Sequence, residues 1–116
     1  METKTPILPI STVAEILEVH QRTLRIYDNE GLLSPSRSAK NRRLYSFDDV
    51  EKGEFIQFMT RSLGVNLVGI KIILYLLGES KIDESEYLGK LREIAGDIGY
   101  DDYCQEEIKG KMSRKG

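Results

Sequence analysis

Residues 11–31 read STVAEILEVHQRTLRIYDNEG and decide the fold of this chain. Val13, Ile16 and Leu17 have the i, i+3 and i+4 spacing of a short helix that buries one face. A second helix is predicted over residues 21–29, with its basic and amide side chains on the outward side. Two short helices joined by a tight turn form the helix–turn–helix pattern, although an ordinary helical hairpin with solvated charges has the same spacing.

The ends of these two helices carry capping signals. Thr12 is followed three residues later by Glu15, which matches a capping box, and Ser11 is an alternative N-cap. Gly31 stands where a left-handed residue is expected after the second helix. These signals predict a first helix that begins beside Ser11 or Thr12 and a second helix that ends before Gly31.

A polar and basic segment follows the helices. Pro35 stops any helix, residues 34–41 are predicted to form a loop, and residues 42–46 alternate as a strand does. A strand, a basic loop and a second strand would make a hairpin wing, which beside a helix–turn–helix places cations against neighbouring phosphates. A surface hairpin with solvated charge is the alternative. It is less favoured because four of the six basic residues between positions 20 and 45 fall within residues 37–43.

Charge is unevenly distributed along the chain. The 116 residues carry a net charge of −2, with 40% hydrophobic and 31% charged residues, a composition typical of one globular domain. Residues 20–45 hold six basic and two acidic side chains, whereas the segments on both sides are acidic. Because a polyanion responds to the local surface, the negative total does not exclude nucleic-acid binding.

Few residues could carry catalysis or bind a metal. His20 is the single histidine and Cys104 the single cysteine, so neither a metal-ligand set nor a disulfide framework is predicted. No glycine-rich phosphate loop appears either. We therefore expect a protein that is not an enzyme and that needs no cofactor and no metal. The lack of a secretory signal and of a long apolar run predicts a cytoplasmic location, away from membranes.

The remaining chain is predicted to be helical. Apolar stripes indicate a core helix that opens at residues 47–50, and Asn66 can cap another. A further helix is predicted over residues 83–98, where apolar positions spaced by 3, 3 and 4 residues approximate a weak coiled-coil seam. This dimerisation seam comprises Leu88, Leu91, Ile94 and Ile98. The predicted organisation is a flexible tail over 1–6, a winged domain over 7–78, the dimerisation helix over 79–98 and a partly disordered tail over 99–116.

Several motifs together resemble the MerR family of transcription regulators over residues 8–77, and most closely its HspR heat-shock repressor type. They are VHQRTLRIY (19–27), EGLL (30–33), PSR (35–37), NRRLYS (41–46) and LGVNL (63–67). The resemblance implies a mainly α fold, with a winged helix–turn–helix DNA-binding domain, a small β-hairpin wing and a short C-terminal dimerisation helix. The GlnR/TnrA type of nitrogen-metabolism repressor is a nearby alternative, because its arginine-rich wing and Gly-Val-Asn segment are similar.

The resemblance also implies a repressor that binds double-stranded DNA as a homodimer, with each protomer on one half of an inverted repeat. Base contacts would come from Gln21, Arg22 and Arg25, since Arg pairs well with guanine and Gln with adenine. Phosphate contacts or bracing of the helix would come from His20, Thr23 and Tyr27. The wing would hold the flanking backbone through Arg37, Lys40, Asn41, Arg42, Arg43 and Tyr45. Loss of Arg43 is accordingly expected to weaken binding to all sequences.

The resemblance also bears on how the protein would be regulated. The HspR type is associated with the DnaK chaperone as a co-repressor, so a DnaK-type chaperone is a further partner that the resemblance allows. Gly53 stands where the family usually carries a large aliphatic residue, and it is expected to forfeit packing there. A protein-interaction module whose basic patch binds an acidic protein surface is the alternative from another functional class.

Overall fold

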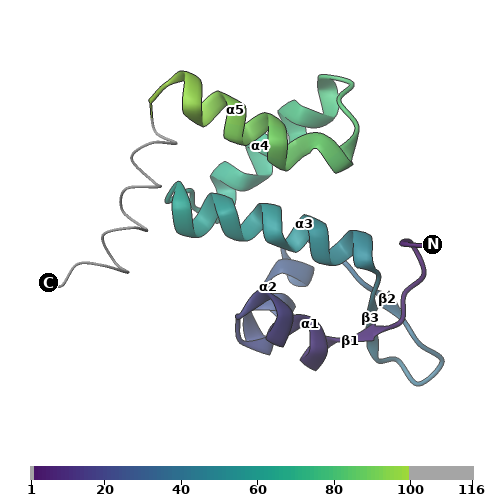
Figure 1. Ribbon diagram of the computed structural model, residues 1–116. Coiled ribbons are helices and arrows are strands. Elements are labelled where there is room, and N and C mark those ends of the chain that lie inside the picture. Colours follow the sequence, from purple (N-terminus) through teal and green to yellow (C-terminus); the bar gives the residue numbers. More distant parts are fainter. Residues whose placement is uncertain (1, 100–116) are drawn as a thin grey trace, which may run out of the picture. The chain divides into compact units, whose positions relative to one another are not determined.

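Figure 1 shows the computed structural model, in which residues 2–99 are described. The chain divides into two compact units, of which the first ends at Phe58 and the second begins at Met59. The first unit contains, in chain order, β1 (Leu8–Pro9), α1 (Ile10–Leu17), α2 (Gln21–Asn29), β2 (Ser36–Arg37), β3 (Arg43–Tyr45) and α3 (Phe47–Gln57). The fold class predicted from the sequence, mainly α with a small winged sheet, is confirmed.

The first helix begins earlier than the capping signals predict. Pro9 is the N-cap of α1, and no side chain caps the first turn. The predicted capping box is wrong because β1 leads directly into the helix: Pro9 is extended, at φ −70° and ψ 160°, and its fixed φ suits a helix entrance. Glu18 then takes a left-handed conformation at φ 58° and ends α1.

The second helix has the predicted bounds and the predicted ending. The N–H of Leu32 donates to the carbonyl oxygen of Tyr27 at 2.8 Å, and the N–H of Gly31 donates to that of Asp28 at 3.0 Å. These two bonds form a Schellman motif, in which Gly31 is left-handed at φ 74°. The turn directs Leu32 into the core, where it is 2% exposed.

The wing is part of a small three-stranded sheet. β3 is its central strand, and β1 and β2 pair with it in antiparallel fashion on either side. Leu8 lies opposite Tyr45, while Ser36 lies opposite Leu44. β2, β3 and the loop between them are the predicted hairpin wing, and β1 is an edge strand that ties the wing to the entrance of α1.

The core of the first unit lies where α1 packs against α2 and α3 (Figure 1). Val13, Leu24 and Ile56, one from each helix, are completely buried. Gly53 on α3 lies against Leu17, so that an added Cβ would come within 2.6 Å of Leu17 Cδ1. The expectation that Gly53 forfeits packing is therefore wrong, since the leucine side chain occupies the space that a larger residue would fill.

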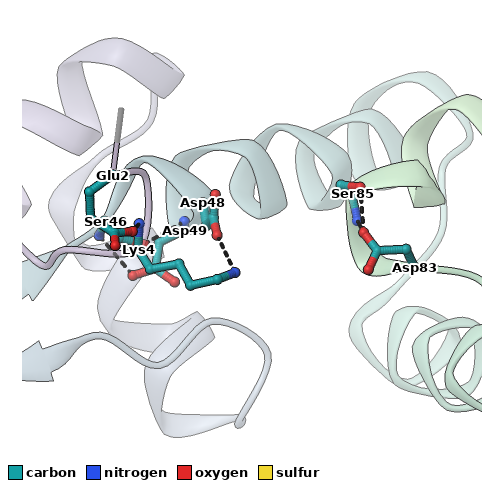
Figure 2. A network of polar contacts seen from close by, with 7 residues as sticks. All are labelled: Glu2, Lys4, Ser46, Asp48, Asp49, Asp83 and Ser85. Carbon is teal, nitrogen blue, oxygen red and sulfur yellow. Dashed lines mark hydrogen bonds and ion pairs between the residues drawn. The ribbon is translucent and has the colours of Figure 1, made fainter.

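The start of α3 holds the N-terminal residues. Ser46 Oγ accepts a hydrogen bond from the N–H of Asp49 at 3.0 Å, and the Asp49 carboxylate accepts one from the N–H of Ser46 at 2.9 Å, which completes a capping box (Figure 2). The N–H of Asp48 donates to the carbonyl oxygen of Thr3 at 3.0 Å, and Lys4 Nζ lies 3.1 Å from the Asp48 carboxylate. Thr3 and Lys4, which belong to the tail predicted to be flexible, thus contact the first turn of α3.

Beyond α3 the chain forms, in order, the π-helical turn η1 (Phe58–Ser62), α4 (Leu67–Glu79), the 3₁₀ turn η2 (Glu84–Glu86) and α5 (Tyr87–Asp97). Asn66 caps α4 as predicted, since its Oδ1 accepts a hydrogen bond from the N–H of Gly69 at 2.8 Å. At the start of η2, the Asp83 carboxylate accepts hydrogen bonds from the N–H and the hydroxyl of Ser85 (Figure 2). None of the helices between residues 2 and 99 is both long enough and apolar enough to cross a membrane.

The predicted dimerisation seam on α5 is only partly accessible. Leu91 is 8% exposed and Leu88 is half-buried within the single chain, whereas Ile94 and Ile98 are 40% and 74% exposed. A seam through all four residues is therefore wrong, because the chain's own packing already covers Leu91. The predicted C-terminal tail lies outside the described residues, apart from Gly99.

Candidate nucleic-acid interface

The outward face of α2 carries the three side chains predicted to read bases. Arg22 and Arg25 are exposed, and Gln21 is half-buried. The Arg25 guanidinium donates a hydrogen bond to Gln21 Oε1 at 3.2 Å, an i, i+4 contact that orients both side chains along the helix. Among the described residues, Arg22 has no carboxylate within 4.0 Å, so its charge is available to a ligand.

Two further residues predicted to contact DNA lie at the first turn of α2. His20 is the exposed N-cap, and its carbonyl oxygen accepts a hydrogen bond from the N–H of Thr23 at 2.9 Å. The imidazole of His20 makes no capping hydrogen bond. Both side chains therefore flank the positive end of the helix dipole, a position that suits a phosphate contact.

The loop of the wing presents two unpaired cations. Ser38 Oγ accepts hydrogen bonds from the backbone N–H groups of Lys40 at 3.2 Å and Arg42 at 3.1 Å, which fixes the tight turn. Asn41 is left-handed at φ 63° within this turn. The side chains of Lys40 and Arg42 are exposed, and within residues 2–99 neither has a carboxylate within 4.0 Å.

One carboxylate joins α2 to the wing. Asp28 Oδ2 accepts a hydrogen bond from Arg43 Nε at 2.9 Å, and the same oxygen lies 3.7 Å from an Arg37 guanidinium nitrogen. The side chains of Asp28 and Arg43 are 17% and 19% exposed, so this pair is largely shielded from water. Arg37 also donates to the carbonyl oxygen of Asn41 at 3.2 Å. Arg43, expected at a phosphate, thus has a protein partner.

Both tyrosines assigned to DNA contact are buried. Tyr45 is 0% exposed, and its hydroxyl is buried without a hydrogen-bond partner. Burial raises the pKa of Tyr45 to about 12, and the nearby Arg43 charge offsets part of this effect. Tyr27 is 4% exposed, and its hydroxyl accepts a hydrogen bond from Gln57 Nε2 at 2.5 Å. A DNA contact by Tyr45 is therefore wrong, whereas the bracing role that was the alternative for Tyr27 stays a prediction, supported by its contact with Gln57.

The structure thus gathers two groups of cations on one unit, and adds residues that the sequence reasoning missed. One group lies on α2 and the other on the wing. Asp28 was counted only as an acidic residue of the basic segment, although its position three residues after Arg25 places it on the same helix face. Ser38 could have been found from the tendency of serine to bond nearby backbone N–H groups in turns.

A helix–turn–helix followed by an antiparallel wing, with exposed arginines on both, defines a winged helix–turn–helix DNA-binding protein. Within residues 2–99, no group of three or more His, Cys, Asp or Glu side chains is placed to hold a metal ion. The chain matches the MerR HTH family of regulatory proteins over residues 8–77. It belongs to the MerR family of DNA-binding transcription regulators.

Curated relatives of the chain are transcription regulators and a heat shock protein. It is 43% identical over 72 residues to a Streptomyces coelicolor protein described as a heat shock protein, HspR, and this match covers 62% of the chain and 48% of the relative. It is 34% identical over 90 residues to the HTH-type transcriptional regulator GlnR of Bacillus anthracis, over 78% of the chain and 68% of GlnR. The chain therefore spans about half the length of the HspR relative that it matches.

Two solved structures share the fold. The transcription regulator PbrR691 of Ralstonia metallidurans, crystallised with lead(II), is 24% identical, with a TM-score of 0.57 over 92% of this chain and 76% of that one. The HTH-type regulator SkgA of Caulobacter crescentus is 23% identical, with a TM-score of 0.60 over 97% of this chain and 84% of that one. At this level of identity the likeness supports the fold alone.

Proposed function

We propose that this protein is a sequence-specific transcriptional repressor of heat-shock or chaperone genes, which binds an inverted repeat as a homodimer. The observation that carries the DNA-binding part is the exposure of Arg22 and Arg25 on α2 together with Lys40 and Arg42 on the wing. The similarity to the HspR relative supports the heat-shock assignment.

We assign the base contacts and the phosphate contacts to different residues according to their positions. Gln21, Arg22 and Arg25 read base edges from the major groove, because arginine can bond guanine bidentately and glutamine adenine. His20, Thr23 and the wing residues Arg37, Lys40, Asn41 and Arg42 contact phosphates, which position the protein without specifying sequence. Arg43 connects the wing to α2 through its ion pair with Asp28.

Selection of DNA fragments by the purified protein tests this function. We expect an inverted repeat whose half-sites lie about one helical turn apart, or a multiple of it. Substitution Arg22→Ala should relax the preference at one base position in each half-site, whereas Lys40→Ala should weaken binding to every duplex alike. If no sequence is enriched and binding does not fall with salt, the basic surface serves another ligand, such as an acidic protein.

The homodimer is proposed on a revised seam. Ile94 of α5 and Ile98, the C-cap of that helix, are exposed, as are Ile72, Tyr75 and Leu76 of α4. Burial of such side chains by a second copy would remove a large apolar area from water. Sedimentation of Ile98→Glu should show dissociation at concentrations where the unaltered protein is dimeric. Lys90→Glu, a charge change at an exposed position of α5, is the matched control.

A DnaK-type chaperone is proposed as co-repressor, and adding purified DnaK should then raise the apparent affinity for the selected DNA. A GlnR-like nitrogen-metabolism repressor is the second candidate, favoured by an alignment over 90 residues that covers 68% of GlnR. The genes that adjoin the selected sequences distinguish these two repressors.

A further inference from the structure

The position of Asp28 requires an explanation. It is the one carboxylate that α2 extends toward the wing, within a surface whose proposed ligand is a polyanion. By the 3.6-residue repeat of the helix, Asp28 lies within about 60° of Gln21 and Arg25 around α2. On electrostatic grounds alone, an acid at this place lowers the affinity for DNA.

The contacts of Asp28 show what it does in the folded unit. Its Oδ2 contacts Arg43 on β3 at 2.9 Å and Arg37 on β2 at 3.7 Å, so one carboxylate touches both strands of the wing hairpin. Arg37 continues the connection to the turn of the wing by donating to the carbonyl oxygen of Asn41 at 3.2 Å. A chain of polar contacts thus runs from α2 to the turn that carries Lys40.

The backbone around Asp28 restricts its position. The carbonyl oxygen of Asp28 accepts the N–H of Gly31 in the Schellman motif, which fixes the last turn of α2. The carboxylate is 17% exposed, so it has lost most of its contact with water, and the two guanidinium groups compensate for that loss. A carboxylate held in this way defines a distance between helix and wing.

We propose that Asp28 is a positioning residue for DNA recognition: it fixes the wing relative to α2, so that both groups of cations meet one duplex in register. This inference rests on the proposed DNA-binding function. Its consequence is that Asp28 lowers the affinity for any DNA while raising the preference for the correct sequence. When Asp28 is neutralised, loss of positioning therefore predicts lower specificity, whereas simple charge removal predicts unchanged specificity with higher affinity for every duplex.

The test compares Asp28→Asn with the unaltered protein on the selected duplex and on a scrambled duplex of equal length, by fluorescence anisotropy. We expect Asp28→Asn to bind the scrambled duplex with equal or higher affinity. The ratio of the affinities for the selected and the scrambled duplex should fall roughly tenfold, which is about the discrimination that one base contact provides. Glu15→Gln removes the same charge from an exposed position on α1 and should leave the ratio unchanged. An unchanged ratio for Asp28→Asn, or a loss of thermal stability alone, overturns the proposal.

Two further measurements assign the effect. In Asp28→Asn/Arg43→Gln, the ratio should fall no further than in Asp28→Asn alone, because both substitutions break the same connection. Hydrogen exchange should be faster at the wing amides of Ser38 and Asn41 in Asp28→Asn, with the amides of α1 unchanged. Unaltered exchange in the wing overturns the inference without any DNA. Failure of the unaltered protein to select a sequence refutes the proposed function instead.

Discussion

Arg42 and Arg43 are adjacent in the sequence, yet they have different surroundings in the structure. Arg42 is exposed and has no carboxylate within 4.0 Å in the described part of the chain, whereas Arg43 is 19% exposed and bonds Asp28 at 2.9 Å. We predict that Arg42→Ala changes the salt dependence of DNA binding and leaves folding stability unchanged. Arg43→Ala should do the reverse.

The size of both effects follows from these contacts. Each lost phosphate contact reduces the slope of log K against log salt by about 0.9, so a dimer with two wings loses about 1.8. Between 50 mM and 200 mM salt, the affinity of Arg42→Ala should then fall about twelvefold less than that of the unaltered protein. Arg43→Ala leaves the shielded Asp28 carboxylate without its closest partner, which costs about 1–3 kcal/mol of unfolding free energy.

Anisotropy titrations over a salt series and urea unfolding measure the two quantities. Lys52→Ala, a cation of α3 outside the proposed interface, serves as the control for the salt slope. Arg43 does not have the role predicted here if Arg43→Ala reduces the slope as much as Arg42→Ala does while its unfolding free energy is unchanged. In that case Arg43 contacts a phosphate, as the sequence first indicated.

Three other substitutions test the fold. Ser46→Ala removes the capping box of α3 and should lower the unfolding free energy by about 1 kcal/mol in urea, and an unchanged midpoint would contradict the cap. Gly53→Leu forces a side chain into the space of Leu17 and should cost about 1–3 kcal/mol, whereas a stabilised variant would show that the space is open. Tyr45 has a pKa raised to about 12 by burial, so its contribution to stability is complete below pH 10.0 and is lost toward pH 12, because the unfolded state ionises first. Tyr45→Phe should therefore reduce the loss of stability above pH 10.0, as measured by urea midpoints on both sides of that pH, and an equal loss in both proteins would count against this origin.

Local sequence patterns predicted the structure correctly where the residues of one helix or turn determine its conformation. The bounds of α2, the left-handed Gly31 and the Asn66 cap were all predicted, since each depends on neighbouring residues alone. The capping box at Thr12 was wrong because a strand pairing with β3, distant in the sequence, set the entrance of α1 instead.

The sequence predicted most of the exposed cations of the candidate site, but not which of its side chains are buried or paired. Nearly all of its cations are exposed as expected, because charged side chains are rarely buried without a partner. The error at Tyr45 arose because strand alternation does not tell which face meets the core. Leu91 illustrates the same difficulty on α5, since an apolar seam pairs as readily within a chain as between two chains.

By itself, the sequence determined the helix–turn–helix, the wing and the family to which the chain belongs, because these follow from periodicity, turn residues and a local excess of cations. Only the tertiary structure decided which of those cations are available. It brought Asp28 against Arg37 and Arg43 from the two strands of the wing, and it enclosed Tyr27 and Tyr45. An ion pair between residues fifteen positions apart depends on how helix and strand pack, and no local pattern specifies that distance.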